Sequence, residues 1–251
     1  MTLRHLLKFS AGAVGAMAIA APAQAAGFTG FAFDAYTTYD DNPTEDIFLQ
    51  SVTHGATTVS NFSLVSGAEL ITNGTRLGPS STDLGDHATS PNGAGATEMP
   101  TSSQVVDFLG NLNLNNIVDT EDSGVSIFEL AFDGPVNTFY LFERGINSAF
   151  TVEALDDSGA VIDNFRISQD LWNDAGYAID TTEIAGAQQV GSYGLSLDQS
   201  VSKVRIISNG VMDNGPDYKI VAAQVPEPGS MAALALVGGA ALLAKRRKQA
   251  A

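Results

Sequence analysis

The alternation of apolar and polar residues in the second half of the chain limits the possible folds more than any other feature. Phe128, Leu130 and Phe132 lie on one face of a predicted strand, and the same spacing returns in Val136–Glu143 after a Gly-Pro turn at 134–135. A period of two residues is typical of strands with one buried face, whereas a helix repeats every 3.6 residues. The pattern therefore predicts antiparallel strands joined by tight turns.

Comparable segments, bounded by Gly, Pro, Asn and Asp, occur along most of the chain. Strands are predicted at 28–36, 47–53, 57–65, 69–72, 125–132, 136–143, 149–155, 160–167, 188–197, 201–208 and 218–225. About ten short strands at such intervals favour an all-β domain over residues 26–225, namely a jelly-roll-like β-sandwich.

Several stretches break the strand pattern. Residues 73–101 consist mainly of small polar residues and predict a long loop within the domain. A short helix is predicted over 103–110, capped by Ser102 or Ser103, with Val105 on its apolar face. Irregular structure is further predicted at 111–116, 119–124 and 168–186.

The N-terminus has the pattern of a secretory signal peptide, residues 1–25. Arg4 and Lys8 give it a positive start, and a short apolar run follows. Ala23 and Ala25 are small residues at the positions that a signal peptidase recognises, so we predict cleavage after Ala25. The alternative is an uncleaved anchor, but the apolar run is shorter than the roughly 20 residues that a membrane span needs.

The C-terminus has three parts in a fixed order. Pro226, Glu227 and Pro228 follow the last predicted strand, and the two prolines end it because they fix φ and lack an amide hydrogen. The uncharged apolar run at 230–244 suits a transmembrane helix. A basic cluster follows, formed by Lys245, Arg246, Arg247 and Lys248. Such a cluster stops translocation and stays on the cytoplasmic side.

This three-part end, residues 226–251, resembles the PEP-CTERM sorting signal. The resemblance implies that an exosortase processes the chain at the Pro-Glu-Pro motif, in a bacterium that makes extracellular polysaccharide. It implies no activity for the domain upstream. A helix over the apolar run would be about 22 Å long, against roughly 30 Å of hydrocarbon in a bilayer. We therefore expect a transient stay in the inner membrane, followed by the cell surface or the extracellular space.

Charge and cysteine content exclude several classes of function. The 28 acidic residues all lie between Asp34 and Glu227, where six Lys and Arg residues accompany them, so this part carries a net charge near −22. Nucleic acid and other anionic polymers are poor partners for such a surface. The chain has no cysteine, which excludes disulfides, thiolate catalysis and cysteine-bound zinc.

No residue pattern in the domain predicts an enzyme. His54 and His87 lie in polar loops, and the sequence contains no nucleophile elbow, zinc-protease motif or nucleotide-binding motif. Glu129, Glu143 and Glu153 fall on consecutive predicted strands, so two of them could form the acid/base pair of a glycoside hydrolase. Outward-facing surface carboxylates give the same pattern, and we predict no catalytic residue.

Acidic turns make calcium the one cofactor that the sequence suggests. The segment 119–124 begins like an EF-hand loop, but its twelfth position is Leu130, where a bidentate Glu is required. Jelly-roll carbohydrate-binding modules often join their first and last strands through a structural calcium. By that resemblance the candidate ligands are Asp34 and Asp217. Solvated turn acids are the alternative.

Together these features predict an exported, non-enzymatic protein of the cell surface or extracellular matrix. Its expected partners are signal peptidase and exosortase, which process it, and extracellular polysaccharide, with the membrane only in transit. The alternatives are a secreted polysaccharide hydrolase and a single-span membrane protein that retains its tail. Aromatic side chains exposed on a sandwich face would favour glycan binding, because they can stack on sugar rings.

Overall fold

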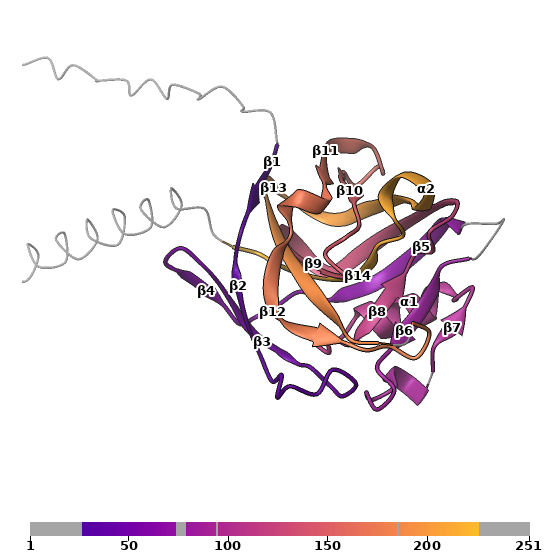
Figure 1. Ribbon diagram of the computed structural model, residues 1–251. Coiled ribbons are helices and arrows are strands. Elements are labelled where there is room, and N and C mark those ends of the chain that lie inside the picture. Colours follow the sequence, from indigo (N-terminus) through magenta and orange to yellow (C-terminus); the bar gives the residue numbers. More distant parts are fainter. Residues whose placement is uncertain (1–26, 74–78, 94, 185, 226–251) are drawn as a thin grey trace, which may run out of the picture.

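The computed structural model describes residues 27–73, 79–93, 95–184 and 186–225. Its strands form an eleven-stranded and a three-stranded sheet (Figure 1). The strands are β1 Phe28–Phe31, β2 Asp34–Thr37, β3 Leu49–His54, β4 Thr57–Val59, β5 Val65–Asn73, β6 Ser81–Leu84, β7 Thr97–Glu98, β8 Asn116–Asp119, β9 Val125–Arg144, β10 Phe150–Leu155, β11 Val161–Ile167, β12 Asn173–Ile179, β13 Gln188–Asn209 and β14 Asp217–Ala223. The helices are α1 Ser102–Leu109 and α2 Gly210–Asp213, with 3-10 turns η1 Pro91–Gly93 and η2 Gln169–Leu171. The predicted all-β sandwich is confirmed, and its jelly-roll form stays a prediction.

Two long strands, β9 and β13, organise the fold. They pair antiparallel over almost their whole length, with register shifts between Ala131 and Thr138 of β9. Before this stretch the even-numbered Phe128 faces the main core, and after it the odd-numbered Phe139 does. The ribbon of β9 and β13 therefore changes its inner face midway and supplies strands to both layers of the sandwich.

Each half of this ribbon carries its own neighbours. One layer adds β5, β10 and β11 to the first half of β9 and the second half of β13. The other layer adds β1, β12 and β14 to the remaining halves, and β14 continues through β8 and β6 to β7. The main core lies between the layers, with fully buried residues such as Leu130, Leu141, Val152 and Ile220. Burial of each such side chain contributes about 1.5–3 kcal/mol.

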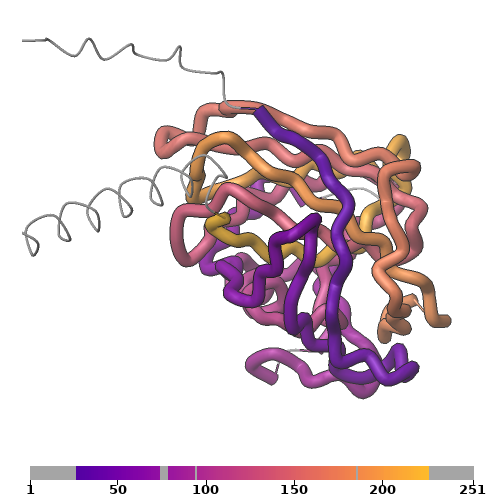
Figure 2. Tube along the Cα trace, turned by 90° about the vertical axis from the view of Figure 1, so that its left-hand side faces the viewer, coloured from indigo at the N-terminus to yellow at the C-terminus, as the bar shows by residue number. Residues whose placement is uncertain are grey.

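A second core lies on the other face of the β9–β14 layer. Tyr140, Phe142 and Val221 alternate with the main-core residues of their strands and point to this side. The arm formed by β2, β3 and β4 covers them, and its indigo trace crosses the domain in Figure 2. Phe33 anchors the arm, because its ring meets Tyr140 at 5.1 Å and Phe142 at 5.6 Å between centroids, both edge to face.

Asparagine side chains attach this arm to the main sheet. The buried Asn113 accepts a hydrogen bond from the amide of Ile47 at 3.1 Å, and the buried Asn115 donates to the carbonyl of Pro43 at 3.0 Å. Buried backbone groups need such partners. The side chains therefore bind the arm where no regular strand ladder reaches it.

The predicted short helix forms as α1, with a different cap. Thr101 is the N-cap, and its hydroxyl accepts from the amide of Gln104 while the Gln104 side chain accepts from the Thr101 amide. Ser102 and Ser103, the predicted caps, lie inside the helix, because this reciprocal capping box starts it one residue earlier. Val105 is fully buried, as its position on the apolar face predicts.

Lys219 is fully buried at the C-terminal end of α1. Its amine donates to the carbonyl of Phe108 and, at 3.2 Å, to the side-chain oxygen of Asn111. Carbonyls in the last turn of a helix have no partner within the helix, so this contact satisfies one of them. Burial lowers the pKa of Lys219 well below its ordinary value.

Two predicted turns do not end strands. The Gly-Pro pair at 134–135 stays within β9, so the segments predicted at 125–132 and 136–143 are one element. The segments predicted at 188–197 and 201–208 likewise join as β13. The chain bends at these places and keeps its partner strand, and a local turn signal cannot distinguish a bend from a reversal.

Regions predicted as irregular contain strands. β6 and β7 lie within 73–101, β8 covers 116–119, and β12 lies within 168–186. All four residues of Ser81–Leu84 are buried, as are all four of Asn116–Asp119. Most of them are polar, so they lack the apolar alternation on which the prediction depended.

The first described strand, β1, begins at the end of the sheet where the last one, β14, finishes (Figure 1). One register row crosses β1, β13, β9 and β14, and its members are Thr29, Ser196, Thr138 and Ala223. Three strand spacings separate its ends, roughly 15 Å. The chain therefore enters and leaves the domain on one side.

Asn137 binds the chain just beyond β14. Its side-chain amide donates to the carbonyl of Val225 at 2.8 Å, and its side-chain oxygen accepts from the Val225 amide at 2.9 Å. The two bonds imitate one step of a β-ladder. The folded part thus extends to the residue that immediately precedes Pro226.

Several predicted features lie outside the described residues. They are the signal peptide 1–25 with Ala23 and Ala25, the motif Pro226, Glu227 and Pro228, the helix 230–244, and the basic residues Lys245, Arg246, Arg247 and Lys248. Within the part of the chain that the structure describes, no helix combines the length and the apolar character that crossing a membrane requires.

Candidate functional site

Charged and hydroxyl side chains occupy one register row at the end of the sheet remote from the chain exits. The row crosses β7, β6, β8, β14 and β9, and its members are Glu98, Ser81, Asp119, Asp217 and Arg144. Residues that face each other across antiparallel strands lie on the same side of the sheet. Because β14 runs from Asp217 to Ala223, the row lies roughly 20 Å from the exits.

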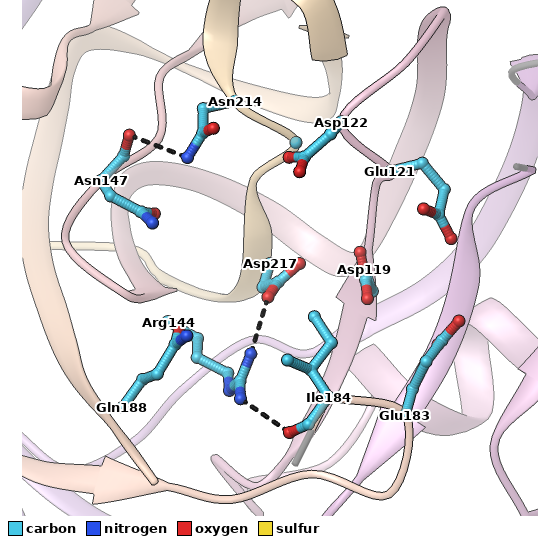
Figure 3. A pocket seen from close by; sticks show the side chains of 11 residues that line it. Asp119, Glu121, Asp122, Arg144, Asn147, Glu183, Ile184, Gln188, Asn214 and Asp217 are labelled. Atoms are coloured by element: carbon cyan, nitrogen blue, oxygen red, sulfur yellow. Dashed lines mark hydrogen bonds and ion pairs between the residues drawn. The ribbon is translucent and has the colours of Figure 1, made fainter. Parts of the chain in front are cut away.

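The row borders a cavity of about 410 Å³. Asp119 and Asp217 lie next to each other in it, with Arg144 on one side and Glu121 and Glu183 on the other (Figure 3). Among the described residues that line the cavity, Ile184 is the one apolar side chain, and none is aromatic. Such an interior suits an ion or a small polar group better than an apolar ligand.

Arg144 supplies the positive charge of the cavity. Its side chain is 1% exposed and contacts the Asp217 carboxylate at 3.3 Å. The same guanidinium donates to the carbonyls of Ile184 at 3.0 Å and Gly186 at 3.1 Å. Arg144 therefore joins β14 to the loop that carries Glu183.

Asp119 and Asp217 form a coupled carboxyl pair. Burial raises the pKa of both, and for Asp119 the negative charge of Asp217 raises the pKa further. A hydrogen bond from Asp119 and the charge of Arg144 partly offset the shift of the Asp217 pKa. The pair therefore keeps a proton at a pH at which separate carboxyl groups have lost theirs.

Further carboxylates converge beside this pair. They form two sets, Asp83 with Asp119 and Glu183, and Glu98 with Glu121 and Glu183, and in each set the oxygens lie within 4.8 Å of one another. The hydroxyl of Ser81 donates to Glu183 at 2.5 Å. Burial raises the pKa of Asp83, Glu121 and Glu183. An all-oxygen set of this kind matches the ligands that hard cations prefer.

The structure does not bring together Asp34 and Asp217, the pair predicted to hold calcium. Asp34 is exposed on β2 in the three-stranded sheet and borders a different cavity, next to Asp174. Asp217 lies in the acidic cavity, which Glu121 and Asp122 also border. The acidic segment after β8 thus belongs to the site, whereas Asp34 does not.

Four residues of the site could not be predicted from the sequence. Ser81, Asp83, Glu98 and Glu183 lie in regions predicted as irregular. An isolated acidic residue in such a region gives the same sequence pattern whether its side chain faces water or a cavity. The pairing of β6 with β7 and β8 brings the first three to the site, and no local pattern reports that pairing.

Two of the three carboxylates considered for glycoside hydrolysis share an arginine partner. Arg205 binds Glu129 at 2.6 Å and Glu153 at 2.8 Å. Glu143 lies on β9 together with Glu129, not on a separate strand, and is fully buried. None of the three borders the acidic cavity.

The two histidines of the domain make no carboxylate contact among the described residues. Nδ1 of His87 hydrogen-bonds with the hydroxyl of Thr44 at 3.0 Å, and Nδ1 of His54 with the carbonyl of Ala32 at 2.8 Å. The ring of His54 packs against Phe31 at an interplanar angle of 42°, with 4.4 Å between centroids.

The same two rings, with Tyr140 and Val225, border a second cavity of about 290 Å³. This aromatic cavity lies at the end of the sheet where the chain leaves the domain. Its lining of rings and hydroxyl groups contrasts with the charged lining of the acidic cavity.

Comparison with known families identifies the C-terminal end of the chain. Residues 224–248 match the family model of the PEP-CTERM protein-sorting motif. The matched residues contain the predicted Pro-Glu-Pro motif, the apolar run and the basic cluster, so the predicted sorting signal is confirmed. The motif marks an exported protein that an exosortase processes. No curated protein and no solved structure shows a significant match to the chain.

Proposed function

We propose, from the premise that this chain ends in a PEP-CTERM protein-sorting motif, that it is a non-enzymatic protein of the cell surface or extracellular matrix. One observation carries the proposal: the fold is complete where the motif begins. β14 ends at Ala223, and Asn137 holds Val225 with two hydrogen bonds. Cleavage after Val225 would remove no strand and no core side chain, so the processed protein keeps its whole domain.

The C-terminus of the mature protein tests this proposal. We expect that a bacterium with an exosortase yields a mature chain that lacks Lys245–Ala251, and that the same strain without the enzyme yields the full tail. Replacing the Pro-Glu-Pro motif by three alanines should retain the tail in both strains. Mass spectrometry of the intact protein measures each outcome.

A proline outside the motif provides the matched control. Pro135 is exposed in the bend of β9, so Pro135→Ala should be processed like the wild type. A wild-type chain that still ends in Lys245–Ala251 in the exosortase strain would refute the proposal. That result would establish the alternative of a single-span membrane protein.

The aromatic cavity supports glycan as the ligand of the displayed domain. The rings of Phe31 and His54 pack against each other beside Tyr140, and His54 is exposed. Sugar rings stack on such surfaces, while hydroxyls such as that of Thr57 can bind their polar edges. The acidic cavity lacks aromatic rings among its described lining residues and offers no comparable surface.

Binding to a glycan array tests the aromatic cavity. His54→Ala should weaken binding by roughly 3- to 10-fold, the loss expected for one aromatic stacking contact. Tyr36→Ala is the control, because Tyr36 is an aromatic residue that is 70% exposed and does not border the cavity. Equal losses in both variants, or no binding by the wild type, would refute glycan binding at this cavity.

The second candidate function is a hydrolase acting on polysaccharide. It is favoured by the acidic cavity, where Asp119 and Glu183, whose pKa values are raised, adjoin Asp217, because glycoside hydrolysis uses two carboxyl groups on either side of the bond that is cut. New reducing ends released from array ligands by the wild type, and not by Asp217→Asn, would establish this alternative.

A further inference from the structure

We propose a calcium site at the edge of the acidic cavity, with Asp119 and Glu183, which border the cavity, and the adjoining Asp83 as its protein ligands. The site would join β6, β8 and the loop before β13 at the end of the domain remote from the sorting motif. It does not depend on the function proposed above.

Asp119 carries the proposal. Its residue is 5% exposed, and its carboxyl group faces the cavity (Figure 3). It accepts no hydrogen bond from an amide, a hydroxyl or a cationic side chain of the described residues, and its polar neighbours are other carboxyl groups. A buried carboxylate without a donor is strongly unfavourable, so this position takes up either a proton, in the pair with Asp217, or a cation.

Two acidic residues near Asp119 already have donors, namely Asp217 in the cavity and Asp83 beside it. Asp217 is paired with Arg144. Asp83 accepts the amides of Leu84 at 2.8 Å and Glu183 at 3.2 Å. Arg144 is engaged by Asp217 and by two loop carbonyls, so it cannot also neutralise Asp119.

The spacing of the oxygens fits a cation of the size of calcium. Calcium binds oxygens at 2.3–2.6 Å, so ligands on opposite sides of the ion lie roughly 5 Å apart. The oxygens of the three proposed ligands all lie within 4.8 Å of one another. Ser81 orients Glu183 by its hydrogen bond, as outer contacts commonly orient metal ligands.

The donor set selects calcium over other metals. It contains no histidine and no cysteine, which disfavours zinc and copper. Magnesium demands near-octahedral geometry and keeps several waters, whereas calcium accepts irregular sets of carboxylates. Glu98 and Glu121, which adjoin Glu183, add negative charge around the ion.

Calorimetry and thermal unfolding of the full-length protein in detergent test the site. Calcium chloride added to chelator-treated protein should bind with measurable heat and should raise Tm by about 5–10 °C when its concentration is about 100 times Kd. Magnesium chloride at the same concentration should have a much smaller effect. An equal effect of magnesium would overturn the assignment to calcium.

Two variants keep the test specific. Asp119→Asn should abolish the calcium-dependent shift, yet melt at or above the wild-type temperature in EDTA, which shows that it folds. Asp34→Asn, at the exposed acid outside the cavity, should keep the full shift. The proposal is wrong if calcium leaves the wild-type Tm unchanged, or if Asp119→Asn responds as the wild type does.

Discussion

Replacing Arg144 by methionine should lower the free energy of unfolding by about 3–5 kcal/mol in metal-free buffer at neutral pH. The substitution keeps an unbranched, flexible side chain, although a shorter one, and removes the charge. The Asp217 carboxylate, 8% exposed in its side chain, would then stay buried without a cation. The carbonyls of Ile184 and Gly186 would lose their donor at the same time. Urea unfolding followed through the single tryptophan, Trp172, measures the loss.

Arg166 provides the matched comparison. It pairs with Asp213 at 2.6 Å, but its side chain is 50% exposed. Ion pairs at the surface contribute about 0–1 kcal/mol, and the Asp213 side chain, 5% exposed, also accepts the amide of Asn209 at 2.9 Å, so Arg166→Met should be nearly neutral. If both variants lost the same stability, burial would not be the reason for the importance of Arg144.

Glu143, which is fully buried on the face opposite Arg144, should have the second large effect, on the pH dependence of stability. Burial raises the pKa of Glu143 to about 7, and the nearby Ser148 hydroxyl and loop amides offset only part of that shift. Neither carboxylate oxygen makes a well-formed hydrogen bond with a described residue. A carboxyl group whose pKa rises on folding takes up a proton, so its contribution to stability is complete below pH 4.5 and is lost as the pH rises through about 7.

Glu143→Gln should therefore remove this pH dependence. At pH 8 the variant should be more stable than the wild type by up to about 3 kcal/mol, and at pH 4 the two should be similar. Denaturant titrations at both pH values measure the difference. Glu69→Gln, at an exposed position on β5, should leave the profile unchanged. A constant gain at both pH values would indicate better packing of the amide, not relief of a buried charge.

Much of the sandwich can be predicted from the sequence because its strands bury one face. Phe128, Leu130 and Val152 follow that rule, and their strands lie close to the predicted positions. The C-terminal sorting signal can also be predicted from the sequence, because its three parts are contiguous and each has its own physical role.

The acidic cavity could not be predicted in the same way. β6 and β8 consist mainly of polar residues that the fold nevertheless buries, so their sequences resemble loops. Asp119 and Asp217 are almost a hundred positions apart, and only the register of β14 against β8 makes them neighbours. Prediction of the calcium pair Asp34 and Asp217 assumed that the first and last strands meet, whereas β14 lies between β9 and β8.

The place of β14 also determines how the domain responds to force. The tail leaves from an interior strand, which pairs with β9 along its whole length and with Ser63 on its other side. A pull along the axis of β14 would load the backbone hydrogen bonds on both of its sides together, whereas an edge strand has such bonds on one side only. As long as the tail is uncut, we therefore expect β14 to resist a pull along the tail. We expect drag on the domain to be borne by the sheet as a whole.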